Sequence, residues 1–222
     1  MVWELPLPAV LAITAVVAYF CGCFNGAVIV SKYILRDDVR KHGSGNAGLT
    51  NFFRTFGGPL TLVVILCDVL KAVIAILFAR YLFFSAYAVF LSASSTVAFW
   101  HNFSEYWGGL FCLLGHMFPC MVHFKGGKGI LSGGAIAIMI DWRIALVVWG
   151  GFLVLAVLTR YISLGSCWAG ASFPFATWFV YHDPLITAMG AFIGLLILYM
   201  HRSNIHRLIT GTENKFSLHK KK

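Results

Sequence analysis

The sequence predicts an all-α protein that crosses a membrane about seven times. Of its 222 residues, 59% are hydrophobic and the mean hydropathy is +0.82. Only 11% are charged, against about 25% in soluble domains. The polar stretches between the apolar runs are too short to bury a core of their own. We therefore expect one integral membrane domain over residues 1–222, with a basic tail over about residues 214–222.

Most of the expected spans are apolar runs near the length that crosses hydrocarbon, about 20 residues. These runs are Leu5–Tyr33, Pro59–Ala79, Ile130–Ile140, Ile144–Leu158, Leu164–Tyr181 and Leu185–Met200. A returning span is expected to end near Pro119, because basic polar stretches flank this part of the chain on both sides and an even number of crossings must separate them. Leu82–Glu105 would then form an elongated or re-entrant outer hairpin. The amino terminus lies outside and the carboxyl terminus inside in this prediction.

Basic residues set the expected orientation. The net charge is +9, and most cations lie in or beside the polar stretches: Lys32, Arg36, Arg40, Lys41, Arg54, Lys125, Lys128, Arg160, Arg202, Arg207, Lys215 and Lys220 to Lys222. Cationic loops gather on the cytoplasmic side, and the terminal lysines suit anionic headgroups. This placement indicates membrane orientation and argues against a nucleic-acid partner. Glu4, in place of a basic flank, and the lack of a small-residue cleavage pattern indicate a retained first span.

The first polar motif, Gly43–Arg54, combines glycines with hydrogen-bond donors. Glycines permit turns that bring backbone amides toward an oxyanion, and an arginine can clamp phosphate through two parallel hydrogen bonds. Its candidate residues are Gly43, Ser44, Gly45, Asn46, Thr50, Asn51 and Arg54. The plainer interpretation is a turn that caps a helix beginning near Thr50.

The second polar motif, Gly115–Gly129, ends in a lysine- and glycine-rich turn before an apolar run. The N-terminus of a helix there would carry free N–H groups and suit an anion. The pattern does not match a nucleotide-binding P-loop, since no Ser or Thr follows Lys128. Its candidates are His116, Lys125, Gly126, Gly127, Lys128 and Gly129. An interfacial basic turn is the plainer interpretation.

The third polar motif covers His201–Glu213. His201, Asn204 and Arg207 recur at a spacing that places them near one face of a helix, and Glu213 follows. His201 could act as a base, donate to a phosphate, or simply lie at the membrane interface. Ser163 adds a smaller polar stretch on the same predicted side.

Two charges lie within a predicted span. Asp68 and Lys71 are three residues apart in the run Pro59–Ala79. Unpaired charges are costly in hydrocarbon, so we expect these two to pair or to line a polar cavity. The six cysteines lie in apolar runs without a Cys-x-x-Cys pair, and we expect buried thiols rather than disulfides or metal ligands.

In this order, the three motifs resemble those of the PlsY family of bacterial membrane glycerol-3-phosphate acyltransferases, over about residues 20 to 215. The resemblance implies seven spans and transfer of an acyl group from acyl phosphate to the sn-1 hydroxyl of glycerol 3-phosphate. It also implies a site on the cytoplasmic face of the bacterial inner membrane and coupling to an enzyme that produces acyl phosphate. Because the eight carboxylates are scattered singly apart from Asp37-Asp38, we expect no metal or other cofactor.

The predicted site divides into two groups of residues. The catalytic group is Ser44, Arg54, Lys128 and His201. The substrate-binding group is Gly43, Gly45, Asn46, Thr50, Asn51, His116, Lys125, Gly126, Gly127, Gly129, Ser163, Asn204, Arg207 and Glu213.

Other classes of protein fit less well. An organic-phosphate transporter would use the same basic loops, but it needs polar groups within several spans, and only Asp68 and Lys71 are obvious. A CDP-alcohol phosphotransferase needs an Asp-rich metal motif that the sequence lacks. The His-x-x-x-x-Asp motif of soluble-headed glycerolipid acyltransferases is also missing.

Overall fold

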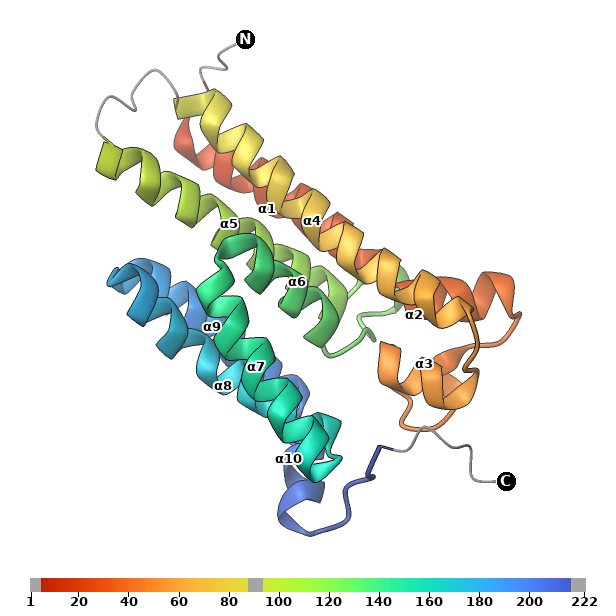
Figure 1. The fold of residues 1–222 in the computed structure, drawn as a ribbon. Helices are drawn as coiled ribbons and strands as arrows, with labels where there is room; N and C mark the ends of the chain where they lie inside the picture. Colours follow the sequence, from red (N-terminus) through yellow and green to blue (C-terminus); the bar gives the residue numbers. More distant parts are fainter. Residues whose placement is uncertain (1–4, 88–93, 217–222) are drawn as a thin grey trace. The chain divides into compact units, whose positions relative to one another are not determined.

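The computed structural model describes residues 5–87 and 94–216, and every regular element in them is helical (Figure 1). The chain divides into two compact units, Met1–Ile140 and Asp141–Lys222. The tail Lys220 to Lys222 lies outside the described residues, as do residues 88–93 of the expected hairpin.

The first unit is built on four helices. Its elements are α1 (Leu7–Cys23), α2 (Gly26–Ile29), a π-helical turn (Val30–Ile34), a 3₁₀ turn (Val39–Lys41), α3 (Leu49–Thr55), α4 (Leu60–Tyr87), α5 (Ser94–Met117), a second 3₁₀ turn (Cys120–Val122) and α6 (Ile130–Ile140). Helices α1, α4 and α5 pack against one another, and α6 packs on α4 and α5. Because α4 and α5 lie between the first two motifs and run in opposite directions, both motifs fall at one end of this unit.

Helix α4 is apolar on its outside and charged within. Its exposed side chains recur every three or four residues: Leu62, Leu66, Leu70, Ile74, Leu77, Tyr81 and Phe84. Its buried side includes Asp68 and Lys71, which are 1% and 5% exposed. A soluble helix shows the reverse pattern. An apolar face toward the surroundings and ion pairs within are what a lipid environment requires.

Helix α4 continues past the predicted end of its run at Ala79, and α5 is one helix from Ser94. The described parts of Leu82–Glu105 are therefore helical extensions rather than a re-entrant loop. Charged residues made these helical extensions hard to recognise in the sequence, and in the structure they are paired. Arg80 Nε donates to Glu105 Oε1 (2.6 Å), and Arg80 Nη2 donates to Met139 O (2.6 Å). Pairing allows a charged residue to lie in an apolar interface between helices.

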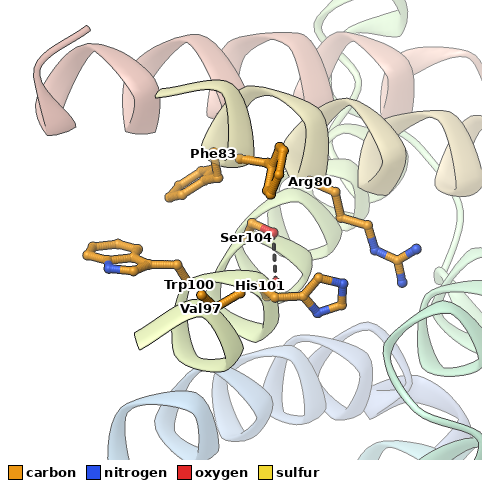
Figure 2. A pocket seen from close by; sticks show the side chains of 7 residues that line it. Arg80, Phe83, Val97, Trp100, His101 and Ser104 are labelled. Carbon is orange, nitrogen blue, oxygen red and sulfur yellow. Dashed lines mark hydrogen bonds between the residues drawn. The ribbon is translucent and has the colours of Figure 1, made fainter. Parts of the chain in front are cut away.

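A small, mainly apolar hollow lies beside Arg80 (Figure 2). Its lining residues are Arg80, Phe83, Phe84, Val97, Trp100, His101 and Ser104. The hollow faces the ends of α4 and α5 that are remote from the polar motifs. It therefore contributes nothing to the predicted phosphate chemistry.

The first apolar run forms two helices rather than one. The chain bends by 41° between α1 and the segment Gly26–Ile34. Asn25 caps the new helix, because its Oδ1 accepts from Val28 N at 3.0 Å. The close approach of α1 to α5 requires glycine on both sides: a Cβ on Gly22 would collide with Cys112 O, and one on Gly115 with Tyr19 O.

The second unit contains α7 (Trp142–Thr159), α8 (Ile162–Tyr181), α9 (Pro184–Met200) and α10 (Arg202–Ile209). Helix α8 packs against α7 and α9, and α10 packs on α8 and α9. Asp141 and Asp183 cap α7 and α9 by accepting from backbone N–H groups in the first turn. The chain bends by 61° between α9 and α10, so the third motif leaves the line of the preceding helix.

Among the described residues, α4 and α7 are each long and apolar enough to cross a membrane. The pairs α1 with Gly26–Ile34 and α9 with α10 meet the same criterion when each bent pair is taken together, and α6 is a shorter apolar helix. The structure is that of an all-helical integral membrane protein. The count of seven spans stays a prediction.

Candidate active site

The side chain of Asn51 organises the loop of the first motif. It is 4% exposed, and its Nδ2 donates to the carbonyl oxygens of Val39, His42 and Asn46 at 3.0–3.1 Å. Its Oδ1 accepts from Ser44 N at 3.0 Å. Because one amide group closes the loop through four hydrogen bonds, Asn51 holds the loop's shape. Its expected contact with substrate stays a prediction.

The glycines of this loop are needed where it turns. Gly43 and Gly45 have φ angles of +56° and +69°, which are unfavourable for other residues. A Cβ on Gly43 would also collide with Asn51 Oδ1. The backbone N–H of Gly45 donates to His42 O at 2.9 Å. The turn therefore leaves Ser44 exposed at its tip. At least one backbone N–H group of the turn, that of Gly45, is already used in a hydrogen bond within the loop.

Hydrogen bonds fix this loop to its own unit at three points. Asn25 Nδ2 donates to Ala47 O (2.9 Å), and Val39 N donates to Ser31 Oγ (3.2 Å). Arg40 Nη1 donates to Val122 O (3.2 Å) in a turn within the second motif. The same guanidinium also binds the Asp38 carboxylate, lowering the pKa of Asp38 to about 2 through its hydrogen bonds. The segment that precedes the first motif is thus hydrogen-bonded to the second motif.

The glycines of the second motif pack its loop against the end of α5. Gly126 N donates to Met117 O (3.2 Å) and Gly127 N to His116 O (3.1 Å). A Cβ on Gly126 would collide with His116 O, and one on Gly127 would approach Ala47 O and the His116 ring too closely. These two amides are therefore structural, and the expectation that they cradle a phosphate receives no support from their geometry. Gly129, at φ +78°, leads into α6.

His116 lies inside the protein. It is 3% exposed, and its Nδ1 lies 2.6 Å from Lys71 Nζ. Lys71 also donates to Asp68 Oδ1 at 2.7 Å. The expected pairing of Asp68 with Lys71 is confirmed, with His116 as an additional member. His116 faces these two charges rather than the exposed loop surface, so its predicted contact with phosphate has no geometric support.

Two cations that belong to the first two motifs are exposed. Arg54 lies in the last turn of α3 and Lys125 in the turn before α6. Neither side chain forms a hydrogen bond or ion pair with any of residues 5–87 and 94–216. Lys128 is half-buried and does have a partner. Arg54 and Lys125 are therefore the cations of the first two motifs whose side chains can take an anion without first releasing a partner among the described residues.

In the second unit, the carboxylate of Glu213 gathers the polar residues predicted for the third motif. Its Oε1 accepts from Ser163 Oγ (2.9 Å) and Asn204 Nδ2 (2.8 Å), and its Oε2 accepts from Arg207 Nε (2.6 Å). Burial raises the pKa of the Glu213 carboxyl, but these hydrogen bonds lower it by more, so the pKa lies below its ordinary value. A carboxylate with this many donors is held in its charged form.

His201 marks the bend between α9 and α10. It is 4% exposed, and its Nδ1 lies 2.8 Å from Ile197 O. Because a carbonyl can only accept, Nδ1 carries the proton. In a neutral imidazole, this leaves Nε2 as the nitrogen with the lone pair. The ring is thus oriented by the backbone, and Nε2 is the atom that can take part in chemistry.

Sequence reasoning identifies most of the polar residues of the motifs but misses the residues outside the motifs that hold them by hydrogen bonds. Asn25 falls within the predicted continuous apolar run, although it caps α2 and also holds the first loop. An Asn-Gly pair within an apolar run is a signal of a helix break that could have revealed it. Arg40 enters the sequence prediction only as a basic residue that reports orientation, because its partner Val122 is distant in sequence.

Among the described residues, no three His, Cys, Asp or Glu side chains are grouped so that they could hold a metal ion. Acidic groups are instead matched singly with cations, as in Asp38 with Arg40 and Glu213 with Arg207. The chemistry available at these motifs is therefore that of cations, hydroxyls, amides and one oriented imidazole.

Comparison with known proteins identifies the family. The model of the family described as glycerol-3-phosphate acyltransferase matches residues 12–211. The chain belongs to this family. A glycerol-3-phosphate acyltransferase of Thermoanaerobacter pseudethanolicus is 34% identical over 203 residues, covering 91% of this chain and 94% of the relative. One of Endomicrobium trichonymphae is 36% identical over 211 residues, covering 93% and 96%.

A solved structure of the family supports the fold. The crystal structure of PlsY, an integral membrane glycerol 3-phosphate acyltransferase, in its glycerol 3-phosphate form, is 30% identical and has a TM-score of 0.79. It covers 93% of this chain and 96% of the PlsY chain. The lysophosphatidic acid form of PlsY matches with 32% identity and a TM-score of 0.74.

Proposed function

We propose that this protein transfers an acyl group from acyl phosphate to the sn-1 hydroxyl of glycerol 3-phosphate. The products are lysophosphatidic acid and phosphate. Family membership supports the acyl acceptor, and the two solved structures of PlsY are of its glycerol 3-phosphate form and its lysophosphatidic acid form. The proposal places the reaction at the cytoplasmic face of a bacterial inner membrane, where basic loops gather.

The observation that carries the proposal is the pair of exposed cations in the first two motifs. Both substrates are phosphorylated, and both need cationic partners. Arg54 and Lys125 have no partner among the described residues, so binding phosphate there does not require breaking an existing ion pair. A guanidinium also offers two parallel N–H groups to phosphate oxygens.

The proposed reaction requires little from a base. The oxygen of the sn-1 hydroxyl forms a bond to the carbonyl carbon of the acyl phosphate. The bond between that carbon and the phosphate oxygen breaks, and the hydroxyl proton goes to the released phosphate. Acyl phosphate is a mixed anhydride and is already activated, so catalysis consists mainly of positioning and of stabilising charge.

Residues of the first unit are proposed to bind and polarise the substrates. Ser44 donates its exposed hydroxyl, Arg54 binds the phosphate of glycerol 3-phosphate, and Lys128 with Lys125 stabilises phosphate charge. Asn46, Thr50 and the exposed glycines of the two loops complete the substrate-binding set. Asn51, Gly126, Gly127 and His116 contribute by holding the loops, since their polar groups are already used within the protein.

Residues of the second unit are proposed to serve the same reaction. His201 donates a hydrogen bond from Nε2 to a substrate phosphate when it is protonated there, and Asn204 and Arg207 bind phosphate oxygens. Glu213 fixes Asn204, Arg207 and Ser163 in place through the hydrogen bonds of its carboxylate. No cofactor or metal is included in the proposal. An enzyme that produces acyl phosphate is the partner that must supply the donor.

The test is product formation by purified protein in detergent, with acyl phosphate and labelled glycerol 3-phosphate. Labelled lysophosphatidic acid is the expected product, with one phosphate released per molecule formed. Acyl coenzyme A as the only accepted donor would overturn the donor assignment. Labelled glycerol 3-phosphate that enters proteoliposomes without being acylated would indicate transport instead. Asp68 and Lys71 give transport little support, because they are buried and paired with each other.

A further inference from the structure

A buried ammonium group lies beneath the second motif, and no step of the proposed reaction uses it. Lys71 Nζ has three N–H donors, and three groups lie within 3.0 Å of it. These are Asp68 Oδ1 (2.7 Å), Phe24 O (3.0 Å) and His116 Nδ1 (2.6 Å). Because an ammonium can only donate, His116 Nδ1 must accept, which makes this imidazole neutral with its proton on Nε2.

The ammonium joins three helical segments of the first unit. Phe24 O lies at the break between α1 and α2, Asp68 and Lys71 lie on α4, and His116 lies in the last turn of α5. Asp68 Oδ1 also lies 3.4 Å from Gly26 N in the first turn of α2. All three charged or titratable side chains of this cluster are at most 5% exposed. Their hydrogen bonds are therefore shielded from water and strengthened by that shielding.

The same cluster holds both ends of the second motif's loop. On the near side, His116 receives the bond from Lys71, and its carbonyl accepts from Gly127 N (3.1 Å). On the far side, Ser132 Oγ in the first turn of α6 donates to the backbone oxygen of Asp68 (3.0 Å). Lys128 lies between these two attachments. Its position relative to α4 is thus set by a neutral histidine before it and a serine after it.

We propose that Lys71, Asp68 and His116 form a positioning cluster that holds the Lys125–Gly129 loop, and through it Lys128, in the geometry required for acyl transfer. The cluster itself does not touch substrate. The kinetic part of this inference rests on the proposed function, while the structural part does not.

Two replacements of His116 distinguish the loss of its hydrogen bond to Lys71 from the loss of the volume that its ring fills. His116→Asn keeps an acceptor near the position of Nδ1, whereas His116→Leu is close to Asn in size but accepts nothing. In His116→Leu we expect kcat to fall about 10- to 100-fold, as for a displaced catalytic group, with KM for glycerol 3-phosphate within about threefold. His116→Asn should retain kcat within about threefold of the parent protein.

Coupling to Lys128 distinguishes positioning from a general loss of packing. In a Lys128→Ala background, His116→Leu should cause little further loss, because residues that act as one unit are strongly non-additive. Full additivity of the two losses would overturn the proposal. Equal damage in His116→Asn and His116→Leu would overturn it as well.

Hydrogen–deuterium exchange of the loop is independent of the reaction. The amides of Gly126 and Gly127 donate to carbonyls of the last turn of α5, so loss of the bond to His116 should speed their exchange by about tenfold or more. Helices α7 and α8 serve as the internal control. Ser132→Ala loosens the other end of the loop and is expected to show the same change to a smaller degree, even if His116→Leu yields too little folded protein.

The two proposals fail in different ways. Faster loop exchange in His116→Leu, with no acylation by the parent protein under any condition, would support the positioning cluster and overturn the proposed function. Unchanged loop exchange in both folded variants, with acylation intact in the parent protein, would overturn the positioning cluster and leave the proposed function in place.

Discussion

The two arginines of the outer motifs, Arg54 and Arg207, are held in opposite ways. Arg54 is exposed and forms no hydrogen bond or ion pair with another described residue. Arg207 donates to Glu213 Oε2 at 2.6 Å. In the first unit, Asp38 is instead paired with Arg40. Among the described residues, Arg54 therefore has no carboxylate partner, whereas Arg207 has the carboxylate of Glu213 at hydrogen-bond distance.

This difference separates binding from positioning. A cation without a counterion gains a new ion pair when phosphate arrives, whereas a paired cation must share or release its carboxylate first. We therefore expect Arg54 to contribute mainly to binding glycerol 3-phosphate, and Arg207 to bind phosphate oxygens more weakly while also keeping Glu213 and Asn204 in place. Each prediction below tests one side of this division.

The largest effect is expected from Arg54→Lys. Charge is retained, but a two-pronged donor becomes a point charge on a flexible stem. We expect kcat/KM for glycerol 3-phosphate to fall about 100-fold or more, in line with the loss of one preorganised donor to a charged oxygen. Expression and apparent Tm should stay unchanged, because Arg54 has no partner among the described residues.

The matched control for that experiment is Arg143→Lys in the second unit. Arg143 is also exposed, but it is paired with Asp141 at 2.9 Å, and it belongs to none of the three motifs. Activity within about twofold of the parent protein is expected there. Normal kinetics in Arg54→Lys would remove Arg54 from the binding set and end the proposed division.

The next largest effect is expected at His201. Its Nδ1 lies 2.8 Å from Ile197 O, so Nε2 is the nitrogen that the proposal assigns to the substrate phosphate. The amide of a glutamine reaches the position of Nε2, that of an asparagine reaches the position of Nδ1, and alanine supplies neither. If His201 donates to phosphate, His201→Gln should retain the most activity, His201→Asn less, and His201→Ala the least, with about a 10- to 100-fold range of kcat.

A catalytic base would behave differently. It would give kcat an acid limb that disappears in every variant, and glutamine would be no better than alanine. Equal loss in His201→Gln, His201→Asn and His201→Ala, with disappearance of that limb, would replace the substrate-assisted mechanism with base catalysis by His201.

The sequence predicted the helices better than the loops. Runs such as Ile130–Ile140 and Leu185–Met200 matched α6 and α9 closely, because polar and turn-forming residues mark both ends of each run. The roles of Asn51 and His116 could not be predicted in the same way. Each is recognisable in the sequence as a polar residue near glycines, but its partners, such as Val39 O and Lys71 Nζ, are set by packing between segments that no local pattern connects.

A smaller effect is expected from Glu213→Gln, which tests the paired side of the comparison. Glutamine keeps the acceptor for Ser163 and Asn204 but loses the charged bond to Arg207. We expect a loss of about 1–2 kcal/mol of stability, seen as an apparent Tm lower by roughly 3–6 °C at neutral pH. The fall in kcat should be about tenfold at most, well below that of Arg54→Lys.

Low pH should remove the difference in stability between the parent protein and Glu213→Gln. The pKa of the folded Glu213 carboxyl lies below its ordinary value of 4.5, so its contribution is complete above about pH 5 and is lost as pH falls through 4.5 and lower. The side chain introduced by Glu213→Gln does not titrate, and the two apparent Tm values should approach each other as pH is lowered from about 6 to well below 4.5. A gap that stays constant over this range would show that the charge of Glu213 does not stabilise the second unit.

The smallest effect is expected from metal removal, which tests whether cations from side chains suffice in both units. In many phosphoryl-handling sites, clustered carboxylates hold a divalent ion that neutralises the phosphate. Here the acidic groups of the described residues are dispersed, with no group of three potential ligands. In the proposed mechanism, Arg54, Lys125 and Lys128 in one unit and Arg207 in the other supply the positive charge that phosphate needs. Activity after treatment with EDTA and gel filtration should therefore stay within about twofold of the untreated protein. Magnesium added back should change the activity no more than sodium at equal ionic strength.

Loss of activity on chelation, with recovery by one particular divalent ion, would contradict a mechanism built on side-chain cations. It would require carboxylates such as Glu213 to act as metal ligands rather than as partners of arginine.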